Sequence, residues 1–170
     1  MEIITIVLQG EITHEDSMGN KTVIRAGDVQ RMSAGTGLTH SEYNLSKEAV
    51  FFYQIWILPD TAGLEPTYAQ KTYDASQWRN RLLPVASGQD ISGAVTFHTD
   101  ATIYRCQLDM GKEVIYDCAT ERCVFLYLTE GSLSVNGQVV SARDQVRVKT
   151  TEQLVIKAQE LSDFMLIDVQ

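Results

Sequence analysis

Histidine is scarce in this sequence, with only His14, His40 and His98 among its 170 residues. A metal site on a rigid scaffold normally needs about three or four protein ligands, and imidazole and carboxylate groups suit first-row metal ions. His40 and Glu42 stand two positions apart in the stretch Ala34–Asn44 (AGTGLTHSEYN). Because alternate residues of a strand point to one face, an extended backbone here aims both side chains into one cavity. The stretch therefore predicts half of a metal site.

Cysteine is also sparse, and its pattern excludes a disulfide framework. Cys106, Cys118 and Cys123 are odd in number and include no pair with CxxC spacing. Such cysteines are typical of reduced thiols that pack as small apolar side chains, not of a zinc site or a disulfide-bonded secreted domain.

Long apolar runs and an excess of basic charge are missing as well. No run approaches the roughly 20 residues that a membrane span needs. The start, MEIITIVLQG, lacks the basic residues and cleavage site of a signal peptide, so we expect a cytoplasmic protein. The net charge of −8 and the scattered Lys and Arg residues leave no basic patch for a phosphate backbone. We therefore expect neither a membrane nor nucleic acid as a direct partner.

Short runs of β-branched and aromatic residues recur along the chain, separated by turn signals rich in Gly and Asn. This pattern predicts an all-β protein, either a sandwich or a barrel. One segment, Tyr68–Leu83 (YAQKTYDASQWRNRLL), has a composition that tolerates a helix, and it follows the strand-breaking loop LPDTAGLEP. We interpret it as part of a linker with a short helix, in which Trp78 and Leu82 pack on the sheet.

A weak internal repeat indicates two similar halves. Ile6–Ile12 (IVLQGEI) resembles Leu126–Leu133 (LYLTEGSL), and Ala26–Met32 (AGDVQRM) resembles Ala142–Val148 (ARDQVRV). We therefore expect an N-terminal domain over residues 1–60, a linker over 61–80 and a C-terminal domain over 81–170.

The glycine spacing before His40 resembles the second conserved motif of the cupin barrel. In this motif Gly27, Gly35, Gly37, His40 and Asn44 match, with Gly35 in place of the usual proline. The longer text GEITHEDSMGNKTVIRAGDVQRMSAGTGLTHSEYN closely resembles the pirin family, bicupins that include bacterial quercetin 2,3-dioxygenase-like proteins. The resemblance implies two cupin barrels, the first incomplete and the second divergent and without metal ligands.

The resemblance also implies a mononuclear metal, usually iron, held by three histidines and one glutamate. His40 and Glu42 match one histidine and the glutamate. The other two family ligands form an HxH pair shortly before an acidic residue and a strand that ends in glycine, which here look like Glu2 and Gly10. We therefore expect the HxH pair just upstream of Met1.

The remaining acidic and histidine residues have simpler interpretations. His14, Glu15 and Asp16 read as a solvated hairpin, and His14 lies on the wrong side of Gly10 to be the missing pair. We interpret His98, in the sequence TFHTD, as a structural residue. An isolated histidine is more often a core residue than a ligand, but the motif spacing and Glu42 favour ligation for His40.

The family activity implied by the resemblance is the metal-dependent dioxygenation of a flavonol (quercetin)-type substrate. Metal coordination lowers the pKa of a substrate hydroxyl, and Glu42 is the candidate catalytic residue that takes its proton. One of the two alternating sets of side chains in FFYQIWI lines the cavity, and the sequence leaves open which one.

Three functional hypotheses follow. The chain is an iron-dependent quercetinase-like dioxygenase, a non-catalytic metal-sensing or protein-binding module, or a chain of impaired activity because half the metal ligands are absent. We favour impaired activity for this chain, and the resemblance implies quercetinase-like dioxygenation as the activity of its family. A barrel without its first strands exposes a sheet edge and the apolar faces of IITIVL and FFYQIWIL, so we also expect a homo-oligomer.

Overall fold

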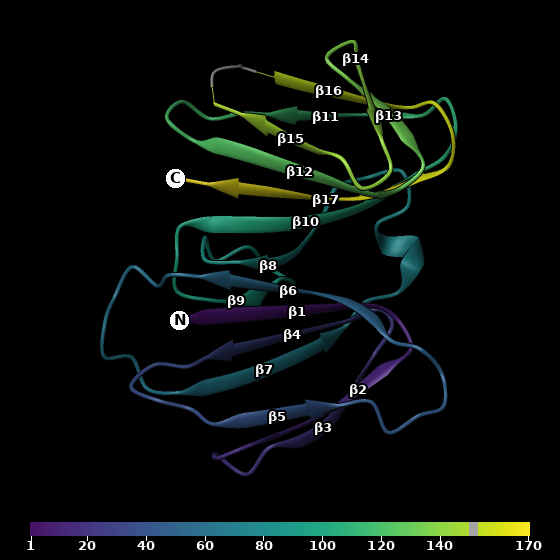
Figure 1. Cartoon of the computed structure of the whole chain (residues 1–170). Helices are drawn as coiled ribbons and strands as arrows, with labels where there is room; N and C mark the ends of the chain where they lie inside the picture. Colours follow the sequence, from purple (N-terminus) through teal and green to yellow (C-terminus); the bar gives the residue numbers. More distant parts are fainter. Residues whose placement is uncertain (150–152) are drawn as a thin grey trace. The chain divides into compact units, whose positions relative to one another are not determined.

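The computed structural model describes residues 1–149 and 153–170, and the described residues confirm an all-β protein (Figure 1). Their one helical element is the short 3-10 helix η1 (Ala75–Gln77). No helix in this part of the chain has the length and apolarity needed to cross a membrane. By its internal contacts the chain divides into two compact units, Met1–Asp74 with Ala86–Thr99, and Ala75–Val85 with Asp100–Gln170. The predicted domain bounds of 1–60, 61–80 and 81–170 stay a prediction.

The first unit contains two antiparallel sheets. One has the order β6-β1-β4-β7 and the other the order β3-β2-β5. The strands are β1 (Glu2–Gln9), β2 (Glu11–Asp16), β3 (Lys21–Arg25), β4 (Asp28–Ser33), β5 (His40–Tyr43), β6 (Phe51–Ile57) and β7 (Thr67–Thr72). A short strand, β9 (Val95–Thr96), pairs in parallel with Ala86 and Ser87.

Strand β1 lies in the middle of its sheet, between β4 and β6, and this position explains its almost continuous apolar sequence. Ile3, Ile4, Ile6 and Val7 are all 5% exposed or less. The expectation that the IITIVL segment exposes an apolar face is therefore wrong, because both of its faces are covered. The exposed apolar side chains belong instead to the edge strand β6.

The second unit repeats this arrangement with a different interior. One sheet has the order β15-β12-β17-β10, with β8 beyond β10, and the other has the order β11-β16-β13-β14. The strands are β8 (Leu83–Ser87), β10 (Ala101–Leu108), β11 (Glu113–Asp117), β12 (Cys123–Glu130), β13 (Ser132–Val135), β14 (Gln138–Ser141), β15 (Gln145–Val148), β16 (Gln153–Ala158) and β17 (Ser162–Val169). One cluster of its buried residues, which extends from Cys106 to Leu166 in sequence, is made almost entirely of aliphatic side chains.

The predicted internal repeat is confirmed by matching hydrogen bonds. In the AGD turn the backbone N–H of Arg25 donates to Asp28 Oδ2 at 2.9 Å. In the ARD turn the backbone N–H of Ser141 donates to Asp144 Oδ2 at 3.0 Å. Equivalent aspartates, Asp28 and Asp144, therefore close equivalent turns at the starts of β4 and β15.

The segment Tyr68–Leu83 contains a short helix, as predicted, but it begins as a strand. Its first residues belong to β7, which pairs with β4, and only Ala75–Gln77 turns helically. The side chains of β7 alternate between two faces, as in any strand, so Tyr68 and Gln70 share one face. The hydroxyl of Tyr68 donates to Gln70 Oε1 at 2.9 Å. Sheet pairing has overridden a composition that tolerates a helix. Trp78 is buried, as predicted.

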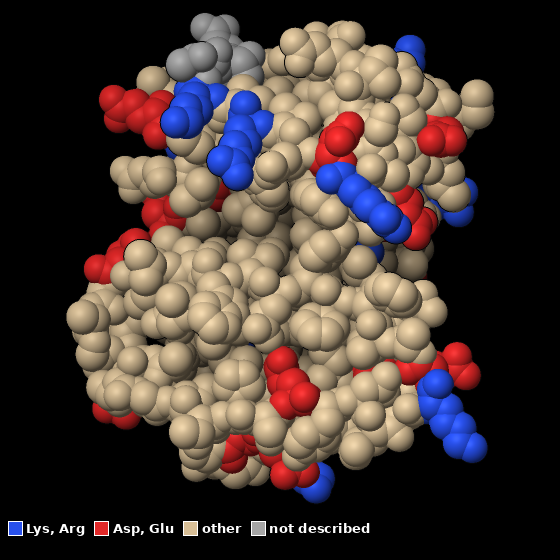
Figure 2. All heavy atoms as spheres, in the orientation of Figure 1, with Lys and Arg blue, Asp and Glu red and all other residues tan. Residues whose placement is uncertain are grey.

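Charged side chains do not gather into a basic surface on the face displayed in Figure 2, where Lys and Arg are interspersed with Asp and Glu. This distribution agrees with the acidic composition of the chain and its net charge of −8.

Candidate functional site

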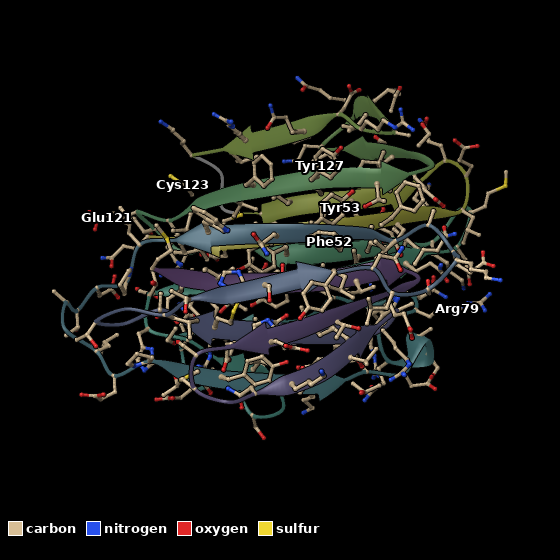
Figure 3. The ribbon with its side chains drawn as sticks, turned by 60° about the horizontal axis from the view of Figure 1, so that its bottom comes forward. Phe52, Tyr53, Arg79, Glu121, Cys123 and Tyr127 are labelled. Atoms are coloured by element: carbon tan, nitrogen blue, oxygen red, sulfur yellow. The ribbon has the colours of Figure 1, made fainter. Side chains whose placement is uncertain are left out.

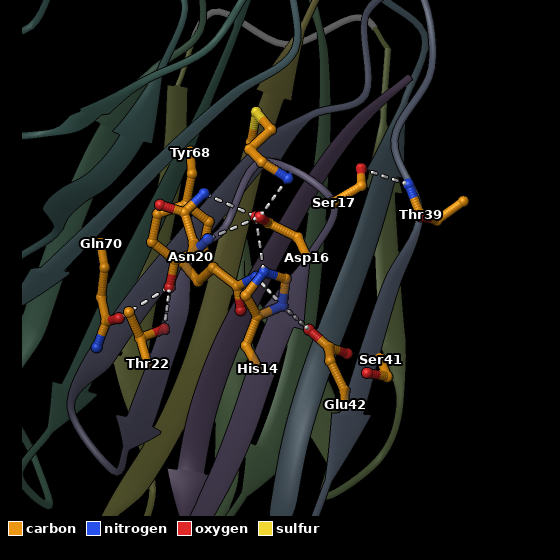
Figure 4. Close-up of polar contacts among 12 residues, drawn as sticks. His14, Asp16, Ser17, Asn20, Thr22, Thr39, Ser41, Glu42, Tyr68 and Gln70 are labelled. Carbon is orange, nitrogen blue, oxygen red and sulfur yellow. Dashed lines mark hydrogen bonds and ion pairs between the residues drawn. The ribbon is translucent and has the colours of Figure 1, made fainter.

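His40 and Glu42 lie on β5, and the pairing of β5 with β2 brings two further polar residues beside them. Figure 4 shows these two residues, His14 and Asp16, together with Glu42. Glu42 is directly opposite His14, and His40 is directly opposite Asp16. Since i and i+2 residues share a face, these four side chains belong to one side of the three-stranded sheet.

His14 is fully buried, so the interpretation of this residue as part of a solvated hairpin is wrong. Its ring stacks with two others, and its ring centroid is 5.8 Å from that of His40 and 5.1 Å from that of Tyr68. A signal was present in the sequence, because His14 shares a strand face with the apolar Ile12, which is also buried. The hairpin reading holds for Glu15, whose carboxylate pairs with Lys21 at the surface.

The contacts of the His14 ring define its tautomer. Nε2 lies 3.1 Å from Asp16 Oδ2, and a carboxylate oxygen only accepts, so Nε2 carries the proton and donates. Nδ1 then accepts a hydrogen bond from Gln30 Nε2 at 3.3 Å. Glu42 Oε1 lies 3.7 Å from the same Nδ1. In the neutral ring with its proton on Nε2, the lone pair of Nδ1 therefore faces the lone pairs of Glu42 Oε1.

Asp16 anchors this arrangement from the end of β2. It accepts hydrogen bonds from the backbone N–H groups of Met18 and Asn20 at 2.9 and 3.0 Å, and from Asn20 Nδ2 at 2.8 Å. Burial alone would raise the pKa of Asp16, but the hydrogen bonds from Asn20, His14 and Met18 together lower the pKa below its usual value. Asp16 is therefore held as a carboxylate that orients His14.

Glu42 has one satisfied and one unsatisfied oxygen. Oε2 accepts a hydrogen bond from Gln54 Nε2 at 2.9 Å. Oε1 is buried and has no hydrogen-bond partner among the described residues. A buried carboxylate oxygen without a partner is costly unless a cation or a proton meets it. This orphaned oxygen, on the same face as the His40 imidazole, fits a donor set for a first-row metal ion.

Gln54 shows which alternating set of β6 faces the site. Because its amide reaches Glu42, the set of Phe52, Gln54 and Trp56 lies on the side of the candidate site. The other set is Phe51, Tyr53 and Ile55. Figure 3 labels Phe52 and Tyr53, one residue from each set. Phe52 and Trp56 remain 39% and 63% exposed, so β6 presents aromatic surface next to a buried polar centre.

A hollow of about 370 Å³ opens beside His40 and has room for a small ligand. It is lined by Glu15, Asp16, Ser17, Thr39, His40 and Ser41. Within residues 1–149 and 153–170, no group of three or more His, Cys, Asp or Glu side chains is placed to hold a metal ion by itself. His40 and Glu42 are therefore two neighbouring donor groups, not a complete site among these residues.

His98 lies outside this site. Its Nδ1 is 3.5 Å from Glu2 Oε1 and 3.4 Å from Ser33 Oγ, and Ser33 donates to Glu2 Oε2 at 2.8 Å. These contacts tie the segment Ala86–Thr99 to β1 and β4, which agrees with the predicted structural role. The three cysteines are free thiols, also as predicted.

Comparison with known proteins identifies both halves of the chain. The family model described as Pirin matches residues 1–57, and the model described as the quercetinase C-terminal cupin domain matches residues 84–169. The quercetin 2,3-dioxygenase of Escherichia coli K12 is 38% identical over 170 residues, which cover 99% of this chain and 72% of that protein. A pirin-like protein of Caulobacter vibrioides is 38% identical over 169 residues, or 99% of this chain and 73% of that one.

A solved structure agrees with these matches. The crystal structure of the bacterial pirin YhhW from Escherichia coli in complex with nickel(II) superposes with a TM-score of 0.92 at 36% identity. The match covers 99% of this chain and 72% of that one. With cupin strands in both units and such matches over nearly its whole length, this chain belongs to the pirin family.

Proposed function

We propose that the first unit contributes His40 and Glu42 to a mononuclear metal site that serves the dioxygenation of a flavonol (quercetin)-type substrate. The observation that carries this proposal is the buried, unpartnered Oε1 of Glu42, on the same face of β5 as His40. When bound, a redox-active first-row metal, for which we propose iron, polarises a substrate hydroxyl and brings dioxygen into reach.

The residues of the chain have separate tasks in this proposal. His40 borders the hollow that admits the substrate. Besides holding the metal, Glu42 accepts the proton of the substrate hydroxyl, because this carboxylate is largely buried from water. Asp16 keeps the proton of His14 on Nε2, so that no imidazole N–H competes for that carboxylate oxygen.

We also propose that residues 1–170 by themselves have impaired activity. They supply two of the four ligands that the family resemblance implies, and each missing ligand removes bond energy and preorganisation. Bound metal should therefore be easily lost on dialysis, and turnover should be low.

Metal binding and turnover test these proposals together. The protein is loaded with Fe²⁺ without oxygen, its metal content is measured after dialysis, and the loss of quercetin absorbance is followed on adding dioxygen. His40→Ala and Glu42→Gln should lower metal retention and turnover further, whereas His98→Ala, the matched control, should change neither. Retention unaffected by His40→Ala would show that the ligand assignment is wrong.

A second candidate function is a non-catalytic metal-sensing or protein-binding module. The observation that favours it is the uncharged edge strand β6, where Phe51, Phe52 and Trp56 are exposed. Full metal retention without turnover in the same experiment would support this function over the dioxygenase.

We further propose that two copies of the chain associate through β6. An edge strand without charged residues, with Phe51, Phe52 and Trp56 exposed, offers apolar side chains to a second copy. Light scattering should show a dimer that Phe51→Lys weakens, whereas Ile115→Lys, at a similarly exposed position in the second unit, leaves it intact. A monomer at every micromolar concentration would contradict association through β6.

A further inference from the structure

We infer that Gln54 is a positioning residue for Glu42, and that the exposed Trp56 decides which end of the Gln54 amide faces this carboxylate. The part of the inference that concerns metal binding rests on the proposed function. The part that concerns the hydrogen-bond chain does not.

Two hydrogen bonds fix the orientation of the Gln54 amide. The indole Nε1–H of Trp56 donates to Gln54 Oε1 at 2.9 Å, and Gln54 Nε2 donates to Glu42 Oε2 at 2.9 Å. An indole N–H only donates and a carboxylate only accepts, so the opposite amide orientation would lose both bonds. Trp56 therefore selects the orientation in which Gln54 presents a donor to Glu42.

As a consequence, the two carboxylate oxygens of Glu42 have different surroundings. Oε2 is occupied by Gln54, and Oε1 is left without a partner, 3.7 Å from His14 Nδ1. Hydrogen bonds from outer groups commonly orient the ligands of a metal site. We therefore assign Oε1 as the metal-binding atom and Gln54 as the group that aims it.

The pattern of burial argues against a purely structural role for Trp56. A tryptophan that serves packing is buried, whereas Trp56 is 63% exposed and engages Gln54 through its polar N–H. The second unit supports the same view. Matching the AGD and ARD turns places Leu166 at the position of Gln54 and Ile156 at the position of Glu42. The second unit therefore lacks both the carboxylate of Glu42 and the amide of Gln54.

Titration with Ni²⁺, followed by calorimetry, tests the effect on metal binding. Gln54→Leu should weaken Ni²⁺ binding by about 10-fold or more, the usual loss for an outer-shell partner. Trp56→Phe keeps the aromatic ring but frees the amide to turn, and should weaken binding by a smaller factor. Phe52→Leu, the matched control on the same face of β6, should leave Ni²⁺ affinity unchanged. Thermal melting should show that all three variants are folded.

A metal-free measurement tests the hydrogen-bond chain itself. The chain has two tryptophans, so the indole N–H groups of Trp56 and Trp78 give two NMR resonances. In metal-free protein, Glu42→Gln should move the Trp56 resonance and leave that of Trp78 in place. In the Gln54→Leu background the same substitution should have no effect on Trp56.

Several outcomes would overturn the inference. Wild-type Ni²⁺ affinity in Gln54→Leu would show that Gln54 does not position Glu42. A Trp56 resonance that stays in place in Glu42→Gln would show that no hydrogen-bond chain connects Trp56 to Glu42. Equal losses in Phe52→Leu and Trp56→Phe would show that apolar surface alone matters. If His40→Ala leaves Ni²⁺ binding intact, the proposed metal site fails, while the metal-free measurement still decides the link from Trp56 to Glu42.

Discussion

The two units share a strand arrangement but fill its interior with opposite chemistry. Matching the AGD and ARD turns, and the hairpins that follow Gly10 and Gly131, aligns their strands residue by residue. His14, Gln30, His40, Glu42 and Gln54 of the first unit then correspond to Val135, Val146, Leu154, Ile156 and Leu166 of the second. The second set is aliphatic throughout, so this strand arrangement does not need polar residues in its interior.

This difference gives the polar interior of the first unit a functional meaning. Buried polar groups are costly without partners, and Gln30 Oε1 and Glu42 Oε1 have none among the described residues. An apolar alternative is available to the same fold, as Leu154 and Ile156 demonstrate. Proteins that keep unsatisfied polar groups at one place commonly do so at a functional site.

The largest effect should come from moving the polar chemistry into the second unit. Ile156→Glu places a carboxylate where Val135 and Leu166 offer no hydrogen bond, so it should lower the free energy of unfolding by about 3–5 kcal/mol, as for other unpaired buried charges. Urea unfolding measures the loss. Val139→Glu, at an exposed position of β14, is the matched control and should stay close to wild type. Equal stability of both variants would mean that this interior is not sealed.

The hairpins of the two units offer a second comparison. In the second unit Asn136 and Gly137 form a two-residue turn with positive φ angles of 47° and 83°, a backbone geometry that closes a hairpin without help from a long loop. In the first unit the loop after β2 is longer, and Asp16 organises it through hydrogen bonds from Met18 and Asn20.

Removing the Asp16 carboxylate should therefore have an intermediate effect. Asp16→Ala leaves the N–H groups of the loop and the Nε2–H of His14 without an acceptor, which should cost about 1–3 kcal/mol of unfolding free energy. Urea unfolding measures the cost. Glu15→Ala is the matched control, since its carboxylate pairs with Lys21 at the surface. If both variants lose the same stability, Asp16 does not organise the loop.

The sequence predicted those features that depend on local pattern. The all-β fold follows from short strands between turn signals, the two similar halves follow from the AGD and ARD turns, and the shared face of His40 and Glu42 follows from alternation. Each of these needs only neighbouring residues.

The features that sequence reasoning missed depend on pairing between distant strands. His14 meets Glu42 because β2 pairs with β5 in one particular register, and a shift by one residue would turn His14 away. Gln54 reaches Glu42 from a different sheet, which no local pattern encodes. The burial of the IITIVL segment likewise follows from the position of β1 between β4 and β6.

The smallest effect concerns the tightness of the second, apolar interior, and it changes no residue. Cys106 belongs to that interior and is fully buried, and burial raises the pKa of its thiol to about 12. Since the thiolate is the reactive form, Cys106 should resist alkylation by iodoacetamide at pH 8 in the native protein. Cys118 and Cys123 are only partly buried, so they should be modified first. Peptide mass spectrometry after timed labelling measures the order, and labelling in urea provides the fully reactive control. If Cys106 is modified as fast as Cys123, the interior of the second unit opens readily to solvent. The two interiors would then differ less than their side chains indicate.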